Sequence, residues 1–293
     1  MTEPEDTAPK PENGTLDPRN RLNALTGREW TYALRSVIAT RYPTSGPEAY
    51  AHALRRAHPS PKPPQLMAEL IRFFTKPGGR VLDPFAGVGG TLLGCALEDR
   101  AGVGIELSAE YSALYAQVCD ELGLARQTMV VGDARQLGSY PEVTAAPFDL
   151  ILSDPPYAQM MAKPKTGERK KRGQAAATPF TANPADLGNL EYHEFLAALR
   201  EIFAAALLQL KPRGYLVLFT KDLQPTREHH NMLHADIVAA LLQLPDLTFR
   251  GYRIWHDQSQ NLYPFGYPFA FVANQVHQFI LIFRKEHSID DTK

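Results

Sequence analysis

The sequence has little cysteine, no long apolar run and almost no net charge, and each shortage excludes a class of protein. Two cysteines occur among 293 residues, Cys95 and Cys119, and both fall inside expected helices without metal-ligand spacing. No apolar run approaches the roughly 18 residues that span a bilayer. The net charge of -1 gives no overall attraction to nucleic acid, so any such surface would be local. We therefore expect a cytoplasmic protein with reduced core cysteines, no metal and no membrane partner.

The two ends of the chain differ in composition from the middle. Residues 1–18 are acidic and proline-rich, which predicts a disordered arm rather than a secretory signal. Residues 19–60 are expected to form a helical extension, because Thr26 and Glu29 have capping-box spacing. One face of that helix is then marked by Trp30, Leu34, Val37 and Ile38. Residues 286–293 are expected to form a short tail.

Strand and helix patterns alternate between residues 61 and 285. The expected strands are 80–83, 102–106, 129–131, 148–153, 215–220, 247–255 and 277–283. The expected helices are 65–75, 91–98, 108–122 and 193–210. Such alternation predicts an α/β domain with a largely parallel sheet and helices on both faces.

The motif Asp154-Pro155-Pro156-Tyr157 follows an apolar run that is expected to be a buried strand. Each proline fixes its own φ and lacks an N–H, which keeps the nearby carbonyls out of a sheet. A carboxylate, a free carbonyl and a ring face suit a planar group that carries an amine. The motif resembles the catalytic motif of the DNA amino-methyltransferases, which methylate the exocyclic nitrogen of adenine or cytosine with S-adenosyl-L-methionine.

A glycine-rich turn at residues 81–91 connects an expected strand to an expected helix, where a ligand can face the helix N-terminus. A dinucleotide-binding fingerprint would need glycine or alanine at position 92, which is leucine. A phosphate-binding loop would need a lysine that this turn lacks. Asp83 instead suits a cationic group. The run looks like the cofactor motif of the same family, with Val88 and Gly90 replacing commoner residues. The resemblance implies cofactor binding by Asp83, Pro84, Phe85, Gly87, Gly89 and Thr91.

Further cofactor residues are implied at the ends of other expected strands. Glu106, with Leu107 beside it, ends the next strand, where a carboxylate can accept both ribose hydroxyls. Asp133 and Ala134 resemble the motif that contacts adenine, and Lys62-Pro63 resembles the segment over the methionine end. The carboxylates that each end a successive strand are Asp83, Glu106, Asp133 and Asp154. Open parallel sheets bind ligands at this edge.

The resemblance covers about residues 60–285 and implies a Rossmann-like methyltransferase fold, a mostly parallel seven-stranded sheet with a closing antiparallel hairpin. It also implies that Asp154 and the Pro155 carbonyl accept hydrogens from the amine, within a motif that includes Pro156. Tyr157 would stack on a base flipped out of the duplex.

Two segments are candidates for contact with DNA. A mobile insertion, 158–190, carries a basic run that is expected to bind phosphates: Lys163, Lys165, Arg169, Lys170, Lys171 and Arg172. The loop 261–271 has aromatics at alternate positions. We favour their filling the core beneath the hairpin over stacking on bases. Gln258, Gln260 and Asn261 are candidate readers of base edges.

The predicted function is methylation of a specific site in double-stranded DNA. The resemblance favours adenine N6 over cytosine N4, because an aspartate as the first residue of the motif is more typical of the N6-adenine enzymes of this family. The alternatives are an N4-cytosine enzyme, then an RNA guanosine amine methyltransferase, then an inactive cofactor-binding protein. The recognition sequence, a partner restriction enzyme and homodimer formation are left open.

Overall fold

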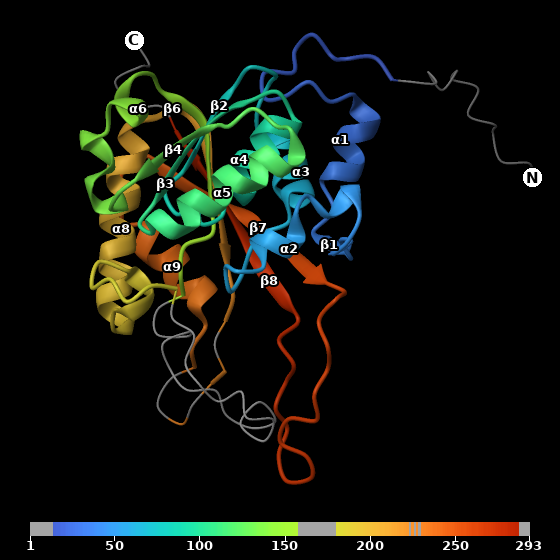
Figure 1. Ribbon diagram of the computed structural model, residues 1–293, viewed down its shortest axis with the longest axis vertical. Helices are drawn as coiled ribbons and strands as arrows, with labels where there is room; N and C mark the ends of the chain where they lie inside the picture. Colours follow the sequence, from blue (N-terminus) through green and yellow to red (C-terminus); the bar gives the residue numbers. More distant parts are fainter. Residues whose placement is uncertain (1–13, 158–179, 223, 226, 228–229, 287–293) are drawn as a thin grey trace, which may run out of the picture.

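An eight-stranded sheet forms the centre of the computed structural model, which describes residues 14–157, 180–222, 224–225, 227 and 230–286 (Figure 1). The strand order is β1-β7-β8-β6-β5-β2-β3-β4. The bounds are β1 (Val37–Thr40), β2 (Arg80–Asp83), β3 (Ala101–Glu106), β4 (Thr128–Val131), β5 (Phe148–Ser153), β6 (Leu210–Thr220), β7 (Leu247–Asp257) and β8 (His277–Lys285). Only β8 runs antiparallel to its neighbours, β6 and β7.

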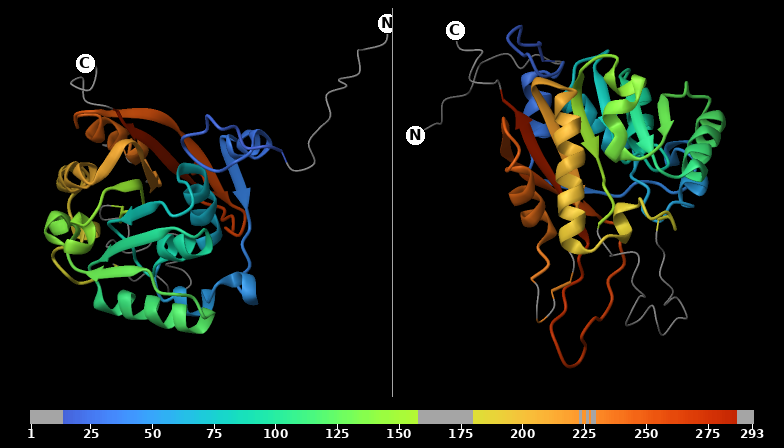
Figure 2. Two further views of the ribbon diagram at one scale, coloured as in Figure 1. Left: turned by 90° about the horizontal axis from the view of Figure 1, so that it is seen from above. Right: turned by 90° about the vertical axis from the view of Figure 1, so that its left-hand side faces the viewer.

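Helices lie on both sides of the sheet (Figure 2). Their bounds are α1 (Gly27–Ala33), α2 (His52–Arg55), α3 (Pro64–Phe74), α4 (Gly90–Leu97), α5 (Ala109–Leu122), α6 (Pro141–Thr144), α8 (Tyr192–Leu208) and α9 (Leu233–Leu241), with short 3-10 helices η1 (Pro47–Ala49), η2 (Ala134–Ser139) and η4 (Leu187–Asn189). Neighbouring residues of β5 supply opposite cores: Leu150 and Leu152 pack with α3, and Ile151 packs with α8. A strand buried on both faces must be apolar throughout, which explains the continuous run.

The α/β class, the parallel sheet and the closing antiparallel hairpin predicted from the sequence are confirmed. The helix α5 illustrates why its bounds were predictable. It begins after Ser108, whose hydroxyl accepts a hydrogen bond from the Tyr111 N–H, and it ends at Gly123 with φ +62°. The helix α9 was not predicted.

The number of strands and the length of the first helix are corrections. The helix predicted to include Val37 and Ile38 ends at Ala33, and β1 pairs in parallel with β7. The β-branched residues of β1 suit a strand, and Ile38 is fully buried against the sheet. The indole N–H of Trp255 donates to the Thr40 hydroxyl at 2.9 Å, which joins the two strands. An eighth strand therefore covers an edge of β7 that a seven-stranded sheet would leave open.

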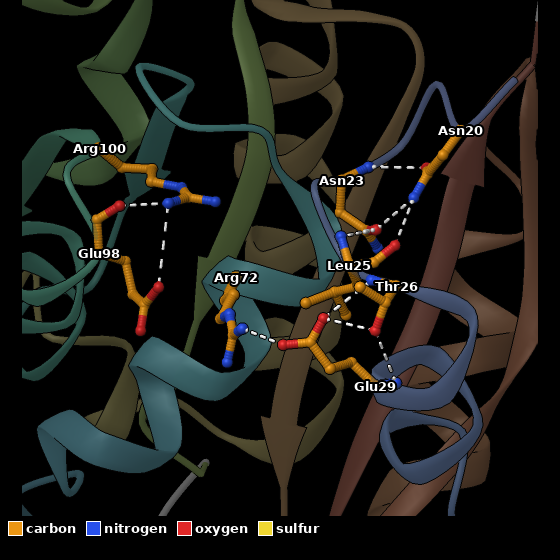
Figure 3. Close-up of polar contacts among 8 residues, drawn as sticks. All are labelled: Asn20, Asn23, Leu25, Thr26, Glu29, Arg72, Glu98 and Arg100. Carbon is orange, nitrogen blue, oxygen red and sulfur yellow. Dashed lines mark hydrogen bonds and ion pairs between the residues drawn. The ribbon is translucent and has the colours of Figure 1, made fainter. Parts of the chain in front are cut away.

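The N-terminal segment is held on α3 by polar contacts (Figure 3). The predicted capping box is present, because Thr26 and Glu29 exchange hydrogen bonds. Glu29 also contacts Arg72 of α3. The side-chain amide of the buried Asn23 donates to the Phe73 carbonyl at 2.6 Å. This bond gives a partner to one of the carbonyls that lack one within α3 at its C-terminal end. These contacts fix the segment that leads into β1.

Candidate functional site

A cavity lies at the carboxyl ends of β2, β3 and β5. The sequence runs from β2 outward to β4 in one direction and from β5 to β6 in the other, so the order reverses between β2 and β5. Ligands bind at such reversal points in open α/β sheets. The predicted residues that line the cavity are Lys62, Asp83, Pro84, Phe85, Gly87, Thr91, Glu106, Leu107, Asp133, Ala134, Asp154, Pro155, Pro156 and Tyr157. Pro63 and Gly89 lie outside the lining and instead cap α3 and α4.

Asp83 is the buried carboxylate at the end of β2. It accepts hydrogen bonds from the Phe85 N–H at 3.0 Å and from the hydroxyls of Thr91 and Ser153. Burial raises the pKa of Asp83 to about 6, although the hydrogen bonds from Ser153 and Thr91 act in the opposite direction. A buried carboxylate with this environment gains free energy when a cation binds beside it.

The glycine-rich turn has two residues in the left-handed region. Gly87 has φ +53° and donates its N–H to Glu106 Oε2 at 2.8 Å. Gly89 has φ +78°, and a Cβ at this position would lie 2.1 Å from the Tyr115 ring. Gly87 therefore shapes the cavity wall, whereas Gly89 allows α4 to approach α5.

Glu106 ends β3 on the other side of this turn. Its second oxygen accepts from the Ser108 N–H at 2.7 Å. Burial raises the pKa of Glu106 to about 7, while the hydrogen bonds from Ser108 and Gly87 lower it. Each carboxylate oxygen keeps a free acceptor position, because an oxygen has two lone pairs. Asp133, further along the edge, is more exposed and forms an ion pair with Arg135.

Asp154 has two side-chain partners. Its Oδ2 forms an ion pair with the ammonium of Lys62, which is buried and lies 5.2 Å from the centre of the Phe219 ring. Its Oδ1 accepts from the Tyr157 hydroxyl at 2.5 Å. Burial and the adjacent Asp154 raise the pKa of Tyr157 well above its usual value, so this hydroxyl stays protonated. Lys62, predicted to cover the methionine end, is thus directly beside the predicted catalytic motif.

One wall of the cavity consists of aromatic side chains that the sequence did not identify. His58 packs edge-on against Tyr111, with ring centres 4.7 Å apart, and stacks on Phe180 at 5.1 Å. The Tyr111 hydroxyl donates to the Phe180 carbonyl at 2.9 Å. Burial, with Lys62 nearby, lowers the pKa of His58 to about 4, so this wall is neutral. The three rings come from distant segments, which leaves no local pattern to recognise.

The two candidate DNA segments have different outcomes. The basic residues Lys163 to Arg172 lie outside the described residues, as does most of the insertion 158–190. The interpretation that the aromatic loop fills the core is wrong. Tyr267, Phe269 and Phe271 are 81%, 93% and 94% exposed. The β7–β8 loop extends beyond the carboxyl edge of the sheet (Figure 1).

No helix in the described part of the chain has the length and apolar character needed to cross a membrane. Nor do the described residues include three or more His, Cys, Asp or Glu grouped so that they could hold a metal ion.

The fold is that of the Rossmann-like methyltransferases. The structure of NSun6 from Pyrococcus horikoshii with SFG is similar with a TM-score of 0.50 and 16% identity, over 78% of this chain and 53% of that one. The similarity is to the fold alone. A rRNA methylase from Streptococcus thermophilus aligns over 76% of this chain and 94% of its own, with a TM-score of 0.44 and 13% identity.

The sequence matches carry the identification further. The family described as DNA methylase (N6_N4_Mtase) matches residues 16–117, which include the glycine-rich turn and Glu106 and end before Asp154. Type II methyltransferase M.XycI from Xanthomonas campestris pv. cyanopsidis is 48% identical over 60 residues, 20% of each chain. The putative methylase YubD from Escherichia coli K12 is 37% identical over 87 residues, 30% of this chain and 37% of its own. The chain thus spans well under half of the length of these relatives. Residues 16–117 are therefore similar to the DNA amino-methyltransferase family.

S-adenosyl-L-methionine is the cofactor of this family, and the chemistry of the cavity fits it. The cofactor carries a cationic amine, ribose hydroxyls and an adenine ring. The cavity presents a buried carboxylate at Asp83, a second carboxylate at Glu106 and a neutral aromatic wall around His58. No anion-binding lysine occupies the glycine-rich turn, so a phosphate ligand does not fit as well.

Proposed function

We propose that this protein methylates DNA by transferring the methyl group of S-adenosyl-L-methionine to the exocyclic amine of a flipped base. One observation carries the proposal. Asp83 and Asp154 line the same cavity on either side of the point where the strand order reverses, and Ser153, next to Asp154, donates to Asp83. A cofactor held at Asp83 would therefore lie directly beside Asp154.

In this proposal the cofactor residues divide the ligand among them. Asp83 would accept hydrogen bonds from the cationic amine, and Glu106 would accept from the ribose hydroxyls. Asp133 and Ala134, at the end of β4, would contact the adenine. When bound, the cofactor supplies an electrophilic methyl group on a sulfonium. The chain's part is to hold that methyl in line with the substrate nitrogen.

Asp154 and Pro155 would act on the substrate amine. The lone pair of an aromatic amine is delocalised into the ring, so the nitrogen is a poor nucleophile. Hydrogen bonds from this amine to the Asp154 carboxylate and the Pro155 carbonyl would favour a pyramidal nitrogen with an available lone pair. The carboxylate also stabilises the positive charge that reaches the nitrogen, and it can accept the proton that leaves.

Lys62 and Tyr157 would position the carboxylate. Both already contact Asp154, one on each oxygen. The amine of the base must share or replace the Lys62 ammonium on Oδ2, because both groups are donors to the same oxygen. Lys62 is therefore a positioning residue in this proposal, and the Tyr157 ring would still face the base across the cavity.

The proposed substrate is double-stranded DNA with a specific site, and the proposed target base is adenine rather than cytosine. Residues 163–172 would contact the DNA phosphates. The preference for adenine depends on the aspartate at position 154. Flipping is needed because a base inside a duplex cannot reach a recessed cavity, and extrusion costs a few kcal/mol.

The variant Asp154→Asn tests the proposal. It keeps the shape of the side chain and loses its charge, so methyl transfer to bacterial DNA should fall at least ~100-fold, as when one preorganised electrostatic partner is removed. Cofactor affinity, measured by calorimetry, should remain within a few-fold of the parent. Asp120→Asn, on the exposed face of α5, is the control and should leave both quantities unchanged. Equal loss of transfer and of cofactor binding in Asp154→Asn would contradict the assigned role.

A further inference from the structure

The loop between β7 and β8 exposes a group of aromatic rings that its own fold does not use. Tyr267, Phe269 and Phe271 are each more than four-fifths exposed. Burying one such ring is worth about 1.5–3 kcal/mol, so three exposed rings within five residues indicate a binding surface. We define the aromatic tip as these three residues.

The aromatic tip has a defined shape. Gly266 has φ +74°, and its carbonyl accepts from the N–H groups of Phe269 and Ala270 at 2.7 and 2.8 Å. Lower in the loop, Tyr263 and Asn274 exchange two hydrogen bonds of 2.8 Å between backbone and side chain. The rings are therefore carried on a closed hydrogen-bonded turn, which lowers the entropy lost when they bind.

The loop begins and ends beside the candidate active site. Gln278, the second residue of β8, has its side-chain oxygen 3.4 Å from the Tyr157 hydroxyl. The loop then extends away from the carboxyl edge of the sheet, as both the front and the side view show (Figures 1 and 2). The aromatic tip therefore projects from the same edge of the sheet at which Asp154 lies.

The chemistry of the loop suits bases rather than phosphates. Residues 258–276 contain no Asp, Glu, Lys, Arg or His. Their polar side chains are mainly amides and hydroxyls, which can pair with base edges, and stacking of a ring on a base is worth about 1–3 kcal/mol. A second copy of the chain is a poorer partner. Three aromatic rings bury about 450–750 Å² in all, below the roughly 800 Å² that each partner buries in a stable complex.

We propose that the aromatic tip inserts into the DNA base stack beside the target base and fills the space that flipping opens. Apolar wedges of this kind offset part of the cost of unstacking. The inference depends on the proposed function, because a base is flipped only if the chain methylates DNA. It adds a residue set that recognises the substrate outside the catalytic motif.

The double variant Phe269→Ser with Phe271→Ser tests the inference. The value of kcat/KM for methyl transfer to sonicated bacterial DNA should fall roughly tenfold or more, since two stacked rings are lost. Its dependence on salt should keep the slope of the parent, because no phosphate contact is removed. Cofactor affinity and melting temperature should not change. Leu208→Ser, exposed at the opposite end of the sheet, is the control.

Fluorescence separates stacking from other contacts. Phe269→Trp should show emission that is quenched on adding the same DNA, beyond the signal of the parent with its Trp30 and Trp255, whereas Leu208→Trp should not. If the parent methylates DNA and the double variant does so equally well, the inference is wrong and the proposed function stands. If the parent neither binds nor methylates DNA, the proposed function fails as well. Loss of self-association in the double variant, measured by sedimentation, would instead assign the tip to a second copy and overturn the inference.

Discussion

Replacement of Asp83 by asparagine should make the ligand-free protein more stable at high pH, although it removes a functional group. Asp83 is buried at the end of β2 and accepts from the Phe85 N–H and from the hydroxyls of Thr91 and Ser153. An asparagine can accept two of these bonds through its carbonyl. Its amide can donate to the Thr91 hydroxyl, which rotates to accept. The substitution therefore changes the charge with little change in packing.

The size of the expected gain in stability follows from the pKa of Asp83, which burial raises from 3.8 to about 6. Each pKa difference of one is worth ~1.4 kcal/mol, so ionised Asp83 costs the folded state about 3 kcal/mol. The sign is set by proton binding: the folded state holds this proton more tightly than the unfolded state does. The contribution of Asp83 to stability is therefore fully present below pH 3.8 and is lost as pH rises through about 6.

The assay compares the melting temperatures of the parent and Asp83→Asn from pH 4 to pH 8 without cofactor. The variant should gain on the parent across this range by up to about 3 kcal/mol, or roughly 6–12 °C for a domain of this size. Glu106 also has a raised pKa, and the Asp83 charge contributes to that rise. Removing this charge should lower the pKa of Glu106, so its effect on stability adds to the difference in the same direction. If the substitution changed only a hydrogen bond, the plots of melting temperature against pH for the parent and the variant would differ by the same amount at every pH. Parallel curves, or a variant that loses stability with rising pH, would refute the reasoning.

Two further substitutions test packing and charge around the site. Lys62→Met removes the cation that pairs with Asp154 and should cost up to about 3 kcal/mol in stability, because a partly buried carboxylate remains without its counter-charge. Adding Asp154→Asn should restore most of this loss, and in urea unfolding a double variant less stable than Lys62→Met would contradict the pairing. Gly89→Ala should destabilise the protein by more than about 2 kcal/mol, since its Cβ would meet the Tyr115 ring. Gly123→Ala is the control: it also has a positive φ, +62°, but lies in open space, so it should cost only about 1 kcal/mol. Equal melting temperatures of the two variants would exclude the clash at Gly89.

The parts of the fold that were predictable have local causes. The end of α5 follows from Ser108 and Gly123, which act within one turn of the helix. The strands β2, β3 and β5 follow from apolar runs that are buried on both faces. The strand β1 was not predictable in this way, because Val37 and Ile38 become a strand only when the distant edge of β7 is beside them. Strand pairing across more than two hundred residues leaves no local signal.

The candidate site divides along the same line. Asp83, Glu106 and Asp154 were found because strand-end position is a property of the sequence, and parallel strands bring these ends together. The ion pair between Lys62 and Asp154 joins residues 92 apart, so the motif alone did not suggest it. The aromatic loop was misassigned to the core, since its alternating rings resemble a buried strand. The three rings are exposed among the described residues, because the loop projects beyond the sheet, and a sequence pattern does not show where a loop projects.

The most direct test of the proposed function is mass spectrometry of nucleosides from DNA incubated with the purified protein and S-adenosyl-L-methionine carrying an isotope-labelled methyl group. We predict labelled N6-methyladenine with the parent protein and at least a ~100-fold lower yield with Asp154→Asn. Labelled N4-methylcytosine would correct the choice of base and keep the amine chemistry. Absence of any labelled amine on DNA, with cofactor binding intact, would contradict the proposal that this cavity methylates DNA.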